Sequence, residues 1–486
     1  MCQEGERSSV SPVWKAVFME RERPENQAGR VSMKARNTMD LTTGSVSKKL
    51  ITFAFPLIMS LILQQLYNAA DKFVVGRFSA DGTSALAAVG STGSSISLIL
   101  GLFAGISVGA NIVCANLKGA RKEADLRRCM HTAVPLSVIF GVIVLALGVL
   151  LSKPLLQLMN VPKTILDKAN LYMVIYFLGA PVSLLYNFGS AILRAHGDTK
   201  RPMIILAVSG LVNVLLNFVL VCFCGMGVEG VALGTIAAQA VSAVWVVCIL
   251  FSPRDAYKLK LREIRIHPDQ LRSLIRIGVP CCFNGIAFSL SNLVLQSAVN
   301  GFGPVVIAGN TAGDSFMALC YQILAGFYSA CVSFAGQCYG ARKYKRIDQL
   351  LITACIWSVG VCLVSAVLGT LFPRQFIGLF DSDPEVITAG IPKFLISCWG
   401  YMIYGVSEVI LGCLRGLKES TVPTAINLLG ICVSRMIWIW IFFPLNPTPG
   451  MIYVCYPISW ALSAIGLGFW YIRTRKRLNK TLAKAC

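Results

Sequence analysis

The sequence is poor in charged residues, and acidic ones are the scarcer kind. Charged residues make up 14% of the 486 residues, with 23 Asp and Glu against 44 Lys and Arg, while hydrophobic residues make up 55%. Soluble domains carry about a quarter charged residues. This shortage, together with apolar runs along most of the chain, excludes an ordinary soluble protein and indicates a polytopic membrane protein.

The sequence also lacks the short motifs of several enzyme classes. No GxxxxGK[ST] phosphate loop and no HExxH zinc motif is present. The three histidines, His131, His196 and His267, are isolated, and the 18 cysteines lie mostly singly within apolar segments, where cysteine acts as a small apolar residue. We therefore expect neither an enzyme nor a cofactor, and no metal beyond a possible Na⁺.

Apolar runs of about 20 residues are typical of membrane-spanning helices, not of the alternating segments of a membrane barrel. The sequence thus predicts an all-α fold with twelve transmembrane helices. Six candidate spans lie in each half: 50–75, 84–117, 130–151, 168–192, 202–224 and 228–251, then 272–299, 304–338, 349–372, 388–413, 423–443 and 450–472.

The two halves are an internal repeat. Gly119-Ala120-Arg121-Lys122 recurs as Gly340-Ala341-Arg342-Lys343, and Leu193-Arg194 as Leu414-Arg415, both 221 residues later; Pro202 returns as Pro423 and Pro56 as Pro280. Because six is an even number, the halves share one orientation. We predict two six-helix lobes related by a pseudo-two-fold axis along the membrane normal, which is a transporter design.

The predicted domains follow from these spans. We expect a disordered cytoplasmic extension (1–46), an N-lobe (47–251), a cytoplasmic linker (252–267), a C-lobe (268–472) and a basic cytoplasmic tail (473–486). The expected inner segments hold 27 Lys and Arg, and the outer loops hold six, Lys393 among them. This asymmetry predicts that both termini are cytoplasmic. The net charge of +21 therefore reflects topology and membrane lipids, and no nucleic-acid partner is expected.

Four polar residues stand out within the spans of the first half. Asp71 ends the first span, Asn213 and Asn217 lie four apart in the fifth, and Thr235 lies in the sixth. A carboxylate with neutral oxygens suits a proton or a hard cation such as Na⁺. The alternative is that the asparagines hold helices together and Thr235 bonds its own backbone.

The second half carries a different set, namely Asp314, Glu408 and Arg435. Glu408 and Arg435 fall on neighbouring spans, so we expect a structural ion pair between them. The alternative is that they line a cavity for a cationic substrate. None of the positions that the repeat pairs with Asp71, Asn213 and Asn217 is acidic, so the first-half site is expected once.

In combination, several motifs resemble the multidrug and toxic compound extrusion (MATE) family. They are Leu41-Thr42-Thr43-Gly44 leading into Phe53-Ala54-Phe55-Pro56-Leu57, then Leu66-Tyr67-Asn68-Ala69-Ala70-Asp71, Leu86-Ala87-Ala88-Val89-Gly90, and Leu193-Arg194-Ala195-His196-Gly197-Asp198. The resemblance covers about 47–472. It implies a monomeric exporter of the plasma membrane that exchanges organic cations or amphipathic drugs for H⁺ or Na⁺ by alternating access.

The resemblance also implies roles for particular residues. The family's first-lobe cation site falls on Asp71, Asn213, Asn217 and Thr235, and its helix-bending proline on Pro56. Another branch places acids in the second lobe, near Phe288 and Tyr404 here, so no such site is expected there. Two alternatives stay open: a lipid-linked saccharide flippase of the same superfamily, and a membrane-embedded enzyme or receptor.

Overall fold

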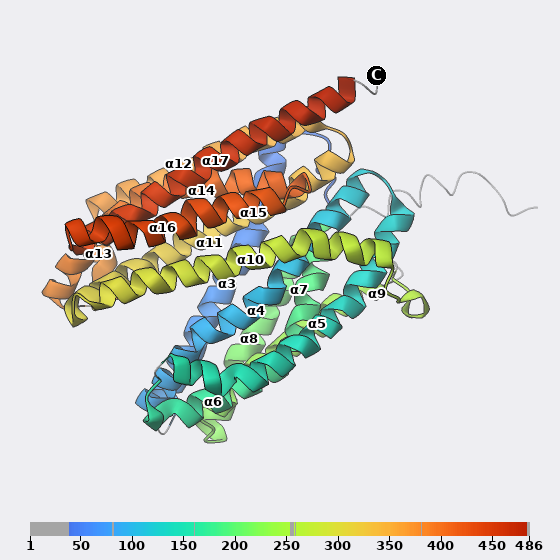
Figure 1. The fold of residues 1–486 in the computed structure, drawn as a ribbon. Helices are drawn as coiled ribbons and strands as arrows, with labels where there is room; N and C mark the ends of the chain where they lie inside the picture. The colour runs from blue at the N-terminus through green and yellow to red at the C-terminus, as the bar shows by residue number, and fades with distance from the viewer. Residues whose placement is uncertain are drawn as a thin grey trace, which may run out of the picture.

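The computed structural model describes residues 38–79, 82–159, 161–252, 257, 259–380 and 382–483. Figure 1 shows two bundles of long helices, one from each half of the chain. The N-lobe contains α3 (Val46–Phe78), α4 (Gly82–Gly119), α5 (Glu123–Leu158), α6 (Lys163–Leu178), α7 (Ala180–Ala195), α8 (Lys200–Phe218), a π-turn (Val219–Phe223) and α9 (Val228–Phe251).

The C-lobe repeats this order. It contains α10 (Pro268–Asn300), α11 (Pro304–Gly340), α12 (Tyr344–Leu371), α13 (Pro373–Gly378), α14 (Pro384–Gly416), α15 (Thr421–Asn427), a π-turn (Leu428–Val433), α16 (Ser434–Ile437), a second π-turn (Trp438–Phe442) and α17 (Pro449–Ala483). A short 3₁₀ turn, Leu261–Glu263, lies between the lobes in the chain.

The predicted spans are confirmed. Eleven helices of the described chain are long and apolar enough to cross a membrane, and α6 with α7, bent by 48°, makes a twelfth. The bend lies at Gly179, just before Pro181, which has no N–H to continue the helical bonds. Large apolar side chains such as Leu150 of α5 point outward, 72% exposed. Such exposed apolar surface is typical of a lipid-facing helix.

The repeat predicted from the sequence is visible in the backbone. Helices α8 and α15 begin 221 residues apart, and so do α9 and α17. Arg121 and Arg342 both have positive φ, at 56° and 57°, and end equivalent helices. Residues other than glycine rarely adopt a positive φ. Its recurrence at the same offset therefore shows that the two lobes share one backbone plan.

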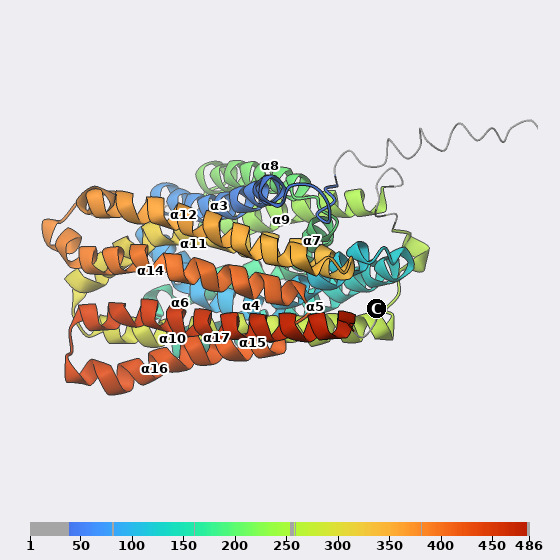
Figure 2. The same ribbon diagram turned by 90° about the horizontal axis from the view of Figure 1, so that it is seen from above.

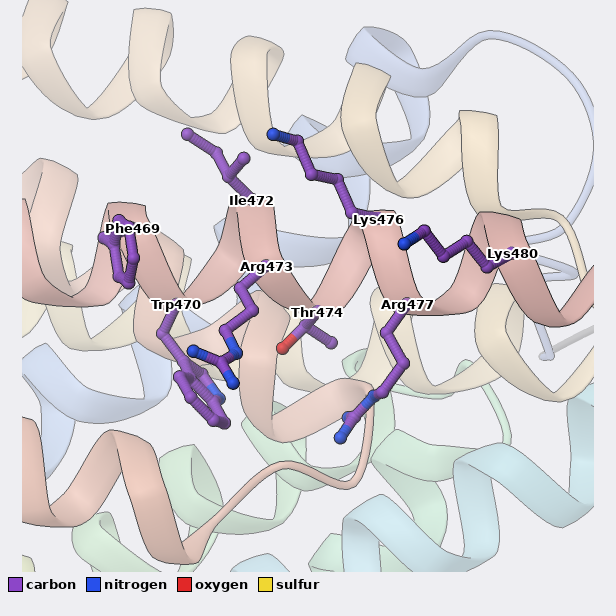
Figure 3. A pocket seen from close by; sticks show the side chains of 8 residues that line it. All are labelled: Phe469, Trp470, Ile472, Arg473, Thr474, Lys476, Arg477 and Lys480. Atoms are coloured by element: carbon purple, nitrogen blue, oxygen red, sulfur yellow. The ribbon is translucent and has the colours of Figure 1, made fainter.

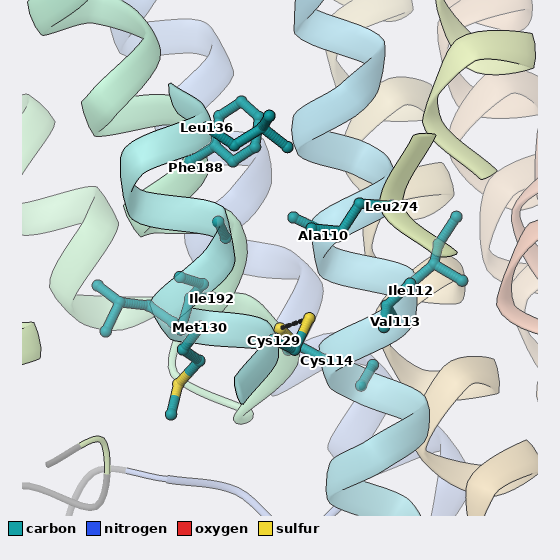
Figure 4. Close-up of a cluster of buried hydrophobic side chains, with 14 of the residues drawn as sticks. Ala110, Ile112, Val113, Cys114, Cys129, Met130, Leu136, Phe188, Ile192 and Leu274 are labelled. Atoms are coloured by element: carbon teal, nitrogen blue, oxygen red, sulfur yellow. Dashed lines mark hydrogen bonds between the residues drawn. The ribbon is translucent and has the colours of Figure 1, made fainter. Parts of the chain in front are cut away.

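The first helix of each lobe packs in both lobes. Leu50, Phe53 and Leu57 at the start of α3 lie in the core of the C-lobe, whereas Val74 and Val75 near its end lie in the N-lobe. The start of α10 likewise joins the N-lobe core through Leu274, which lies beside Ala110 of α4 (Figure 4). The predicted lobe boundaries at 47 and 268 are therefore too simple, because each first helix crosses from one lobe to the other.

The lobes touch at one end and diverge at the other, as Figure 1 shows. In the view from above, the helices of the two lobes overlap (Figure 2). At the closed end the α4 backbone meets α10, and a Cβ added to Gly105 would lie 2.4 Å from the Cys282 nitrogen. Two hydrogen bonds cross the lobes symmetrically: Asn116 Nδ2 donates to the Gly416 carbonyl at 3.1 Å, and Gln337 Nε2 to the Ala195 carbonyl at 2.8 Å. Both pairs are related by the 221-residue repeat.

The segment before α3 differs from the predicted disorder where it is described. The Leu41 side chain is fully buried, its N–H donates to Gln337 Oε1 at 3.1 Å, and the Met39 N–H donates to the Gly197 carbonyl at 3.2 Å. Arg346 binds the carbonyls of Leu41, Thr43 and Gly44. Residues 38–45 thus bind both lobes at the closed end, and the rest of the predicted extension lies outside the described residues.

The linker and the tail are also more structured than predicted. Tyr257 and Leu259 of the linker are buried, and the Lys260 and His267 N–H groups donate to His131 and Thr132 of α5.

The predicted tail continues α17 as far as Ala483. There a hollow of about 680 Å³ is lined by Arg473, Lys476, Arg477 and Lys480 with Phe469 and Trp470, all from this one helix (Figure 3). Basic and aromatic side chains together are typical of a membrane interface.

Candidate functional site

The four polar residues predicted in the first half meet in the N-lobe. Asp71 comes from α3, Asn213 and Asn217 from α8, and Thr235 from α9. Asn217 Nδ2 donates to Asp71 Oδ1 at 2.5 Å, and Thr235 Oγ1 lies 3.3 Å from Asp71 Oδ2. Asn213 Nδ2 donates to Thr235 Oγ1 at 3.3 Å. The residues therefore form one hydrogen-bonded cluster around a carboxyl group that is 6% exposed.

The Thr235 hydroxyl has one hydrogen and two neighbouring acceptors. Thr235 Oγ1 lies 2.9 Å from the Val231 carbonyl, one turn earlier in α9, and 3.3 Å from Asp71 Oδ2. A hydroxyl donates once and accepts twice. If it donates to Val231, only a proton on Asp71 Oδ2 makes the contact with Asp71 a hydrogen bond. The arrangement can therefore hold a proton on this carboxyl oxygen.

A cavity of about 100 Å³ adjoins the cluster and is lined by Asp71, Asn213 and Thr235 among others. Asn213 Oδ1 is buried and has no hydrogen-bond partner in the structure. Asn217 Oδ1 is also unpartnered but packs on Gly234, where an added Cβ would lie 2.1 Å from it. The carboxylate, the Asn213 amide oxygen and the Thr235 hydroxyl are oxygen groups of the kind that bind Na⁺ or other hard cations.

Several cavity residues were missed from the sequence. Tyr67 and Gln239 line the same cavity and lie four residues from Asp71 and Thr235, respectively. Spacing by four places side chains on one helix face, so this signal could have found them. The Tyr67 hydroxyl donates to the Leu206 carbonyl at 2.5 Å, and its ring lies on Gly210, where any Cβ would overlap it. Tyr67 thereby fixes how closely α3 and α8 approach.

Pro56 lies inside α3, which is one uninterrupted helix from Val46 to Phe78. It is buried beside Leu57, the last fully buried residue by which α3 joins the C-lobe core. The Ser60 hydroxyl donates to the Pro56 carbonyl at 2.7 Å. Pro56 thus stands where α3 passes from one lobe to the other, and its role as a hinge stays a prediction.

The ion pair predicted between Glu408 and Arg435 is not what the structure shows. Arg435 Nε donates to Ser459 Oγ and Nη1 to Asn292 Oδ1, each at 3.0 Å, and no ion pair joins it to a carboxylate within the described ranges. Glu408 lines a separate cavity of about 240 Å³ with Tyr321, Tyr404 and Arg415. Sequence position alone placed the two residues on neighbouring spans and could not show which way they face.

Asp314 pairs instead with Lys393, which was expected in an outer loop. Lys393 lies within α14, and its side chain is 3% exposed, whereas the Asp314 side chain is 55% exposed. The Lys393 ammonium also lies 5.7 Å from the centre of the Tyr456 ring. Lysine can be buried here because a carboxylate and aromatic faces surround its charge.

The MatE family model matches residues 56–219 and 280–441, one segment in each lobe. Similar relatives include "Probable multidrug resistance protein YoeA" of Bacillus subtilis, 27% identical over 80% of this chain and 85% of its own. Another is "Probable multidrug resistance protein NorM" of Thermotoga maritima, which is 24% identical over 80% of this chain and 84% of its own length.

Solved structures agree on the fold. A structure described as the outward-facing conformation of a multidrug resistance MATE family transporter matches with a TM-score of 0.83 at 23% identity, over 92% of this chain and 99% of that one. At this identity the likeness shows the arrangement of helices alone. It confirms the predicted two-lobe, twelve-helix architecture.

Proposed function

Because the chain belongs to the MATE family of membrane transporters, we propose that it exports organic cations and other amphipathic drugs in exchange for H⁺ or Na⁺. The observation that carries this proposal is the N-lobe cluster, in which Asp71 is the only acidic side chain among the described residues that line the cavity. A single ionisable group among neutral oxygens can bind and release one cation per cycle.

The two coupling ions would use the cluster differently. A proton on Asp71 Oδ2 lets the carboxyl donate to Thr235 while Thr235 donates to Val231, which satisfies every partner in the contact. Na⁺ would be held by the ionised carboxylate and by the unpartnered Asn213 Oδ1. The cluster supports both, and the proposal concerns the site and not the choice of ion.

Transport requires that the bound cation favours one arrangement of the lobes, since a ligand that binds two states equally shifts neither. The asymmetry of basic residues assigns the closed end, with the linker and the tail, to the cytoplasm. In this state the lobes then open outward, and both termini are cytoplasmic. Motion of α3 about Pro56 would alter the cluster at Asp71, because the two halves of α3 pack in different lobes.

The flippase alternative requires a basic cavity, because its cargo carries phosphates. The buried charges of the spans do not by themselves choose the cargo, because the structure buries Lys393, Arg415 and Arg435 as well as Asp71. What favours cationic cargo is the composition of the N-lobe cavity, where Asp71 is joined by amides and hydroxyls. Translocation of a labelled lipid-linked saccharide, without efflux of organic cations, would favour the flippase.

The test is Asp71→Asn in proteoliposomes, with efflux of a fluorescent organic cation driven by a proton or sodium gradient. We expect gradient-driven efflux to fall about tenfold or more, because hydrogen bonds to a charged group contribute about 1.5–3 kcal/mol each. Drug binding without a gradient should persist. Asp269→Asn, at an exposed site in the first turn of α10, is the matched control and should transport normally. Wild-type efflux by Asp71→Asn would refute the proposal.

A further inference from the structure

Arg435 is a buried cation without a carboxylate partner in the described chain. The residue is 1% exposed, and its Nη2 has no hydrogen-bond partner. The guanidinium carbon lies 4.5 Å from the centre of the Tyr456 ring, with Phe288 and Trp460 at 5.8 and 5.9 Å. Aromatic faces attract a cation through their quadrupole, so this pocket is chemically a site for a positive ion.

The groups around Arg435 correspond through the repeat to residues of the N-lobe cavity. Subtracting 221 from Tyr456, Ser459 and Trp460 gives Thr235, Ala238 and Gln239, and all three line the cavity beside Asp71. Asn292, which accepts from Arg435, lies on α10 within one helical turn of the position paired with Asp71. Arg435 therefore lies in the C-lobe equivalent of the N-lobe cavity.

A π-turn explains how residue 435 reaches this place. Counting by the repeat, Ser434 and not Arg435 answers to Asn213. The π-turn Leu428–Val433 precedes it, whereas the equivalent part of α8 is regular α-helix. A π-turn contains an extra residue, which moves the following residue onto the inward face. Ser434 instead donates to the Gly430 carbonyl of its own helix.

We propose that Arg435 is a built-in cation that permanently fills the C-lobe counterpart of the N-lobe cation site. The guanidinium of Arg435 is covalently attached to the chain, so this cation cannot leave the pocket. The C-lobe therefore keeps its cation through the transport cycle, and only the N-lobe exchanges one. This limit on coupling rests on the proposed function, but the occupancy of the C-lobe site does not.

The test is to remove the side chain and supply its head group. In Arg435→Ala, guanidinium ion should bind the vacated aromatic pocket and raise the Tm at low millimolar concentration, and it should restore efflux lost in the variant. Urea, a neutral molecule of the same shape, should do neither. The wild type should show no such rise, because its own guanidinium fills the pocket. An equal response to urea, or an equal response of the wild type, would overturn the proposal.

A second pair of variants serves if Arg435→Ala does not fold. Arg435→Lys keeps a cation in the pocket, and Arg435→Met has similar length without charge. We expect Arg435→Lys to retain several-fold more efflux than Arg435→Met, and both to keep the hyperbolic dependence of efflux on the coupling ion that one exchanging site produces. Equal efflux by the two variants would show that the charge has no role. Guanidinium binding is also read from the Tm of the double variant Asp71→Asn with Arg435→Ala, so failure of the N-lobe proposal would leave this result unchanged.

Discussion

The two lobes share one backbone plan, yet their equivalent interior sites contain opposite charges from different helices. The N-lobe holds the Asp71 carboxylate beside a cavity of about 100 Å³, while the C-lobe places the Arg435 guanidinium among aromatic rings. The comparison teaches that duplication preserved the helices and their crossings while side-chain changes separated the roles. One lobe presents a site that can gain and lose a cation, and the other contains a cation that cannot leave.

Volume accounts for part of this difference. Where the N-lobe has Thr235 and Gln239, the C-lobe has Tyr456 and Trp460, whose rings fill space and contact Arg435. Lys393 lies on the same Tyr456 ring, so that ring has two cations near it. The C-lobe interior is thus held by aromatic and charged contacts, whereas the N-lobe site consists of small polar groups around free volume.

If charge in the C-lobe is structural and charge in the N-lobe is functional, neutralising a charged side chain should lower stability in the C-lobe but not in the N-lobe. Asp314→Asn leaves the Lys393 ammonium buried without its carboxylate, so we expect a loss of up to about 3 kcal/mol of stability, the low end for a buried pair because Asp314 is half exposed. Asp71→Asn removes a buried carboxylate that has no cationic partner, and it should leave the Tm unchanged or raise it. Thermal unfolding in detergent measures both.

The matched control is the double variant Asp314→Asn with Lys393→Met, which removes both members of the pair. It should regain most of the stability lost in Asp314→Asn, since no uncompensated charge remains. A double variant as unstable as the single one would mean that packing, and not the charge pair, explains the loss. A large fall in Tm for Asp71→Asn would show that the charge in the N-lobe is structural as well.

The sequence predicted the helices and the N-lobe cluster well because both depend on local patterns. Apolar runs define spans, and the motif that contains Asp71, with the spacing of Asn213 and Asn217, identified three members of one cluster. What failed were orientations that depend on packing. Lys393 lies near the start of the predicted span 388–413 but was counted with the outer-loop residues, and only the neighbouring Asp314 and Tyr456 show why it is buried.

The C-lobe site was missed for a further physical reason. The π-turn before Ser434 shifts the register by one residue, so the repeat offset pointed to Ser434 while Arg435 occupies the pocket. Apolar patterns do not reveal a single extra residue within a helical turn. The binding of residues 38–45 to both lobes was equally hidden, because that segment is polar and reads as a loop in the sequence.

The closed end tests whether the lobes are equivalent where they meet. Asn116 and Gln337 make the same crossing bond from opposite lobes, but Gln337 also accepts from the Leu41 N–H. Each bond contributes about 1 kcal/mol. We expect Gln337→Ala to favour separation of the closed end more than Asn116→Ala does, and hydrogen exchange at residues 105–119 and 333–340 should rise in that order. Equal exchange in the two variants would show that the segment before α3 adds nothing to the closed state.

The smallest expected effect concerns His196, whose position answers to Leu417 in the C-lobe; both side chains are buried. Burial lowers the pKa of His196 to about 4, with nearby Lys118 adding to the shift, although its bond to the Ile192 carbonyl opposes it. Below the ordinary pKa of about 6.5, this histidine binds a proton in the unfolded chain but not in the folded protein. Its contribution to the free energy of unfolding is therefore fully present above that pH and is lost as the pH falls toward 4. By this linkage the loss at pH 6 relative to pH 8 is about 0.8 kcal/mol.

His196→Leu gives the N-lobe the residue of the C-lobe and should remove that loss. The variant also lacks the hydrogen bond to Ile192, so its Tm should be lower at both pH values. The informative quantity is therefore the difference in Tm between pH 8 and pH 6, which should be smaller in His196→Leu than in the wild type. His267→Leu should reduce that difference less, because desolvation and nearby basic side chains also lower the pKa of His267 but this position is partly exposed to solvent. If His196→Leu keeps the full wild-type difference, the acid sensitivity arises elsewhere, and the lobes do not differ in this respect.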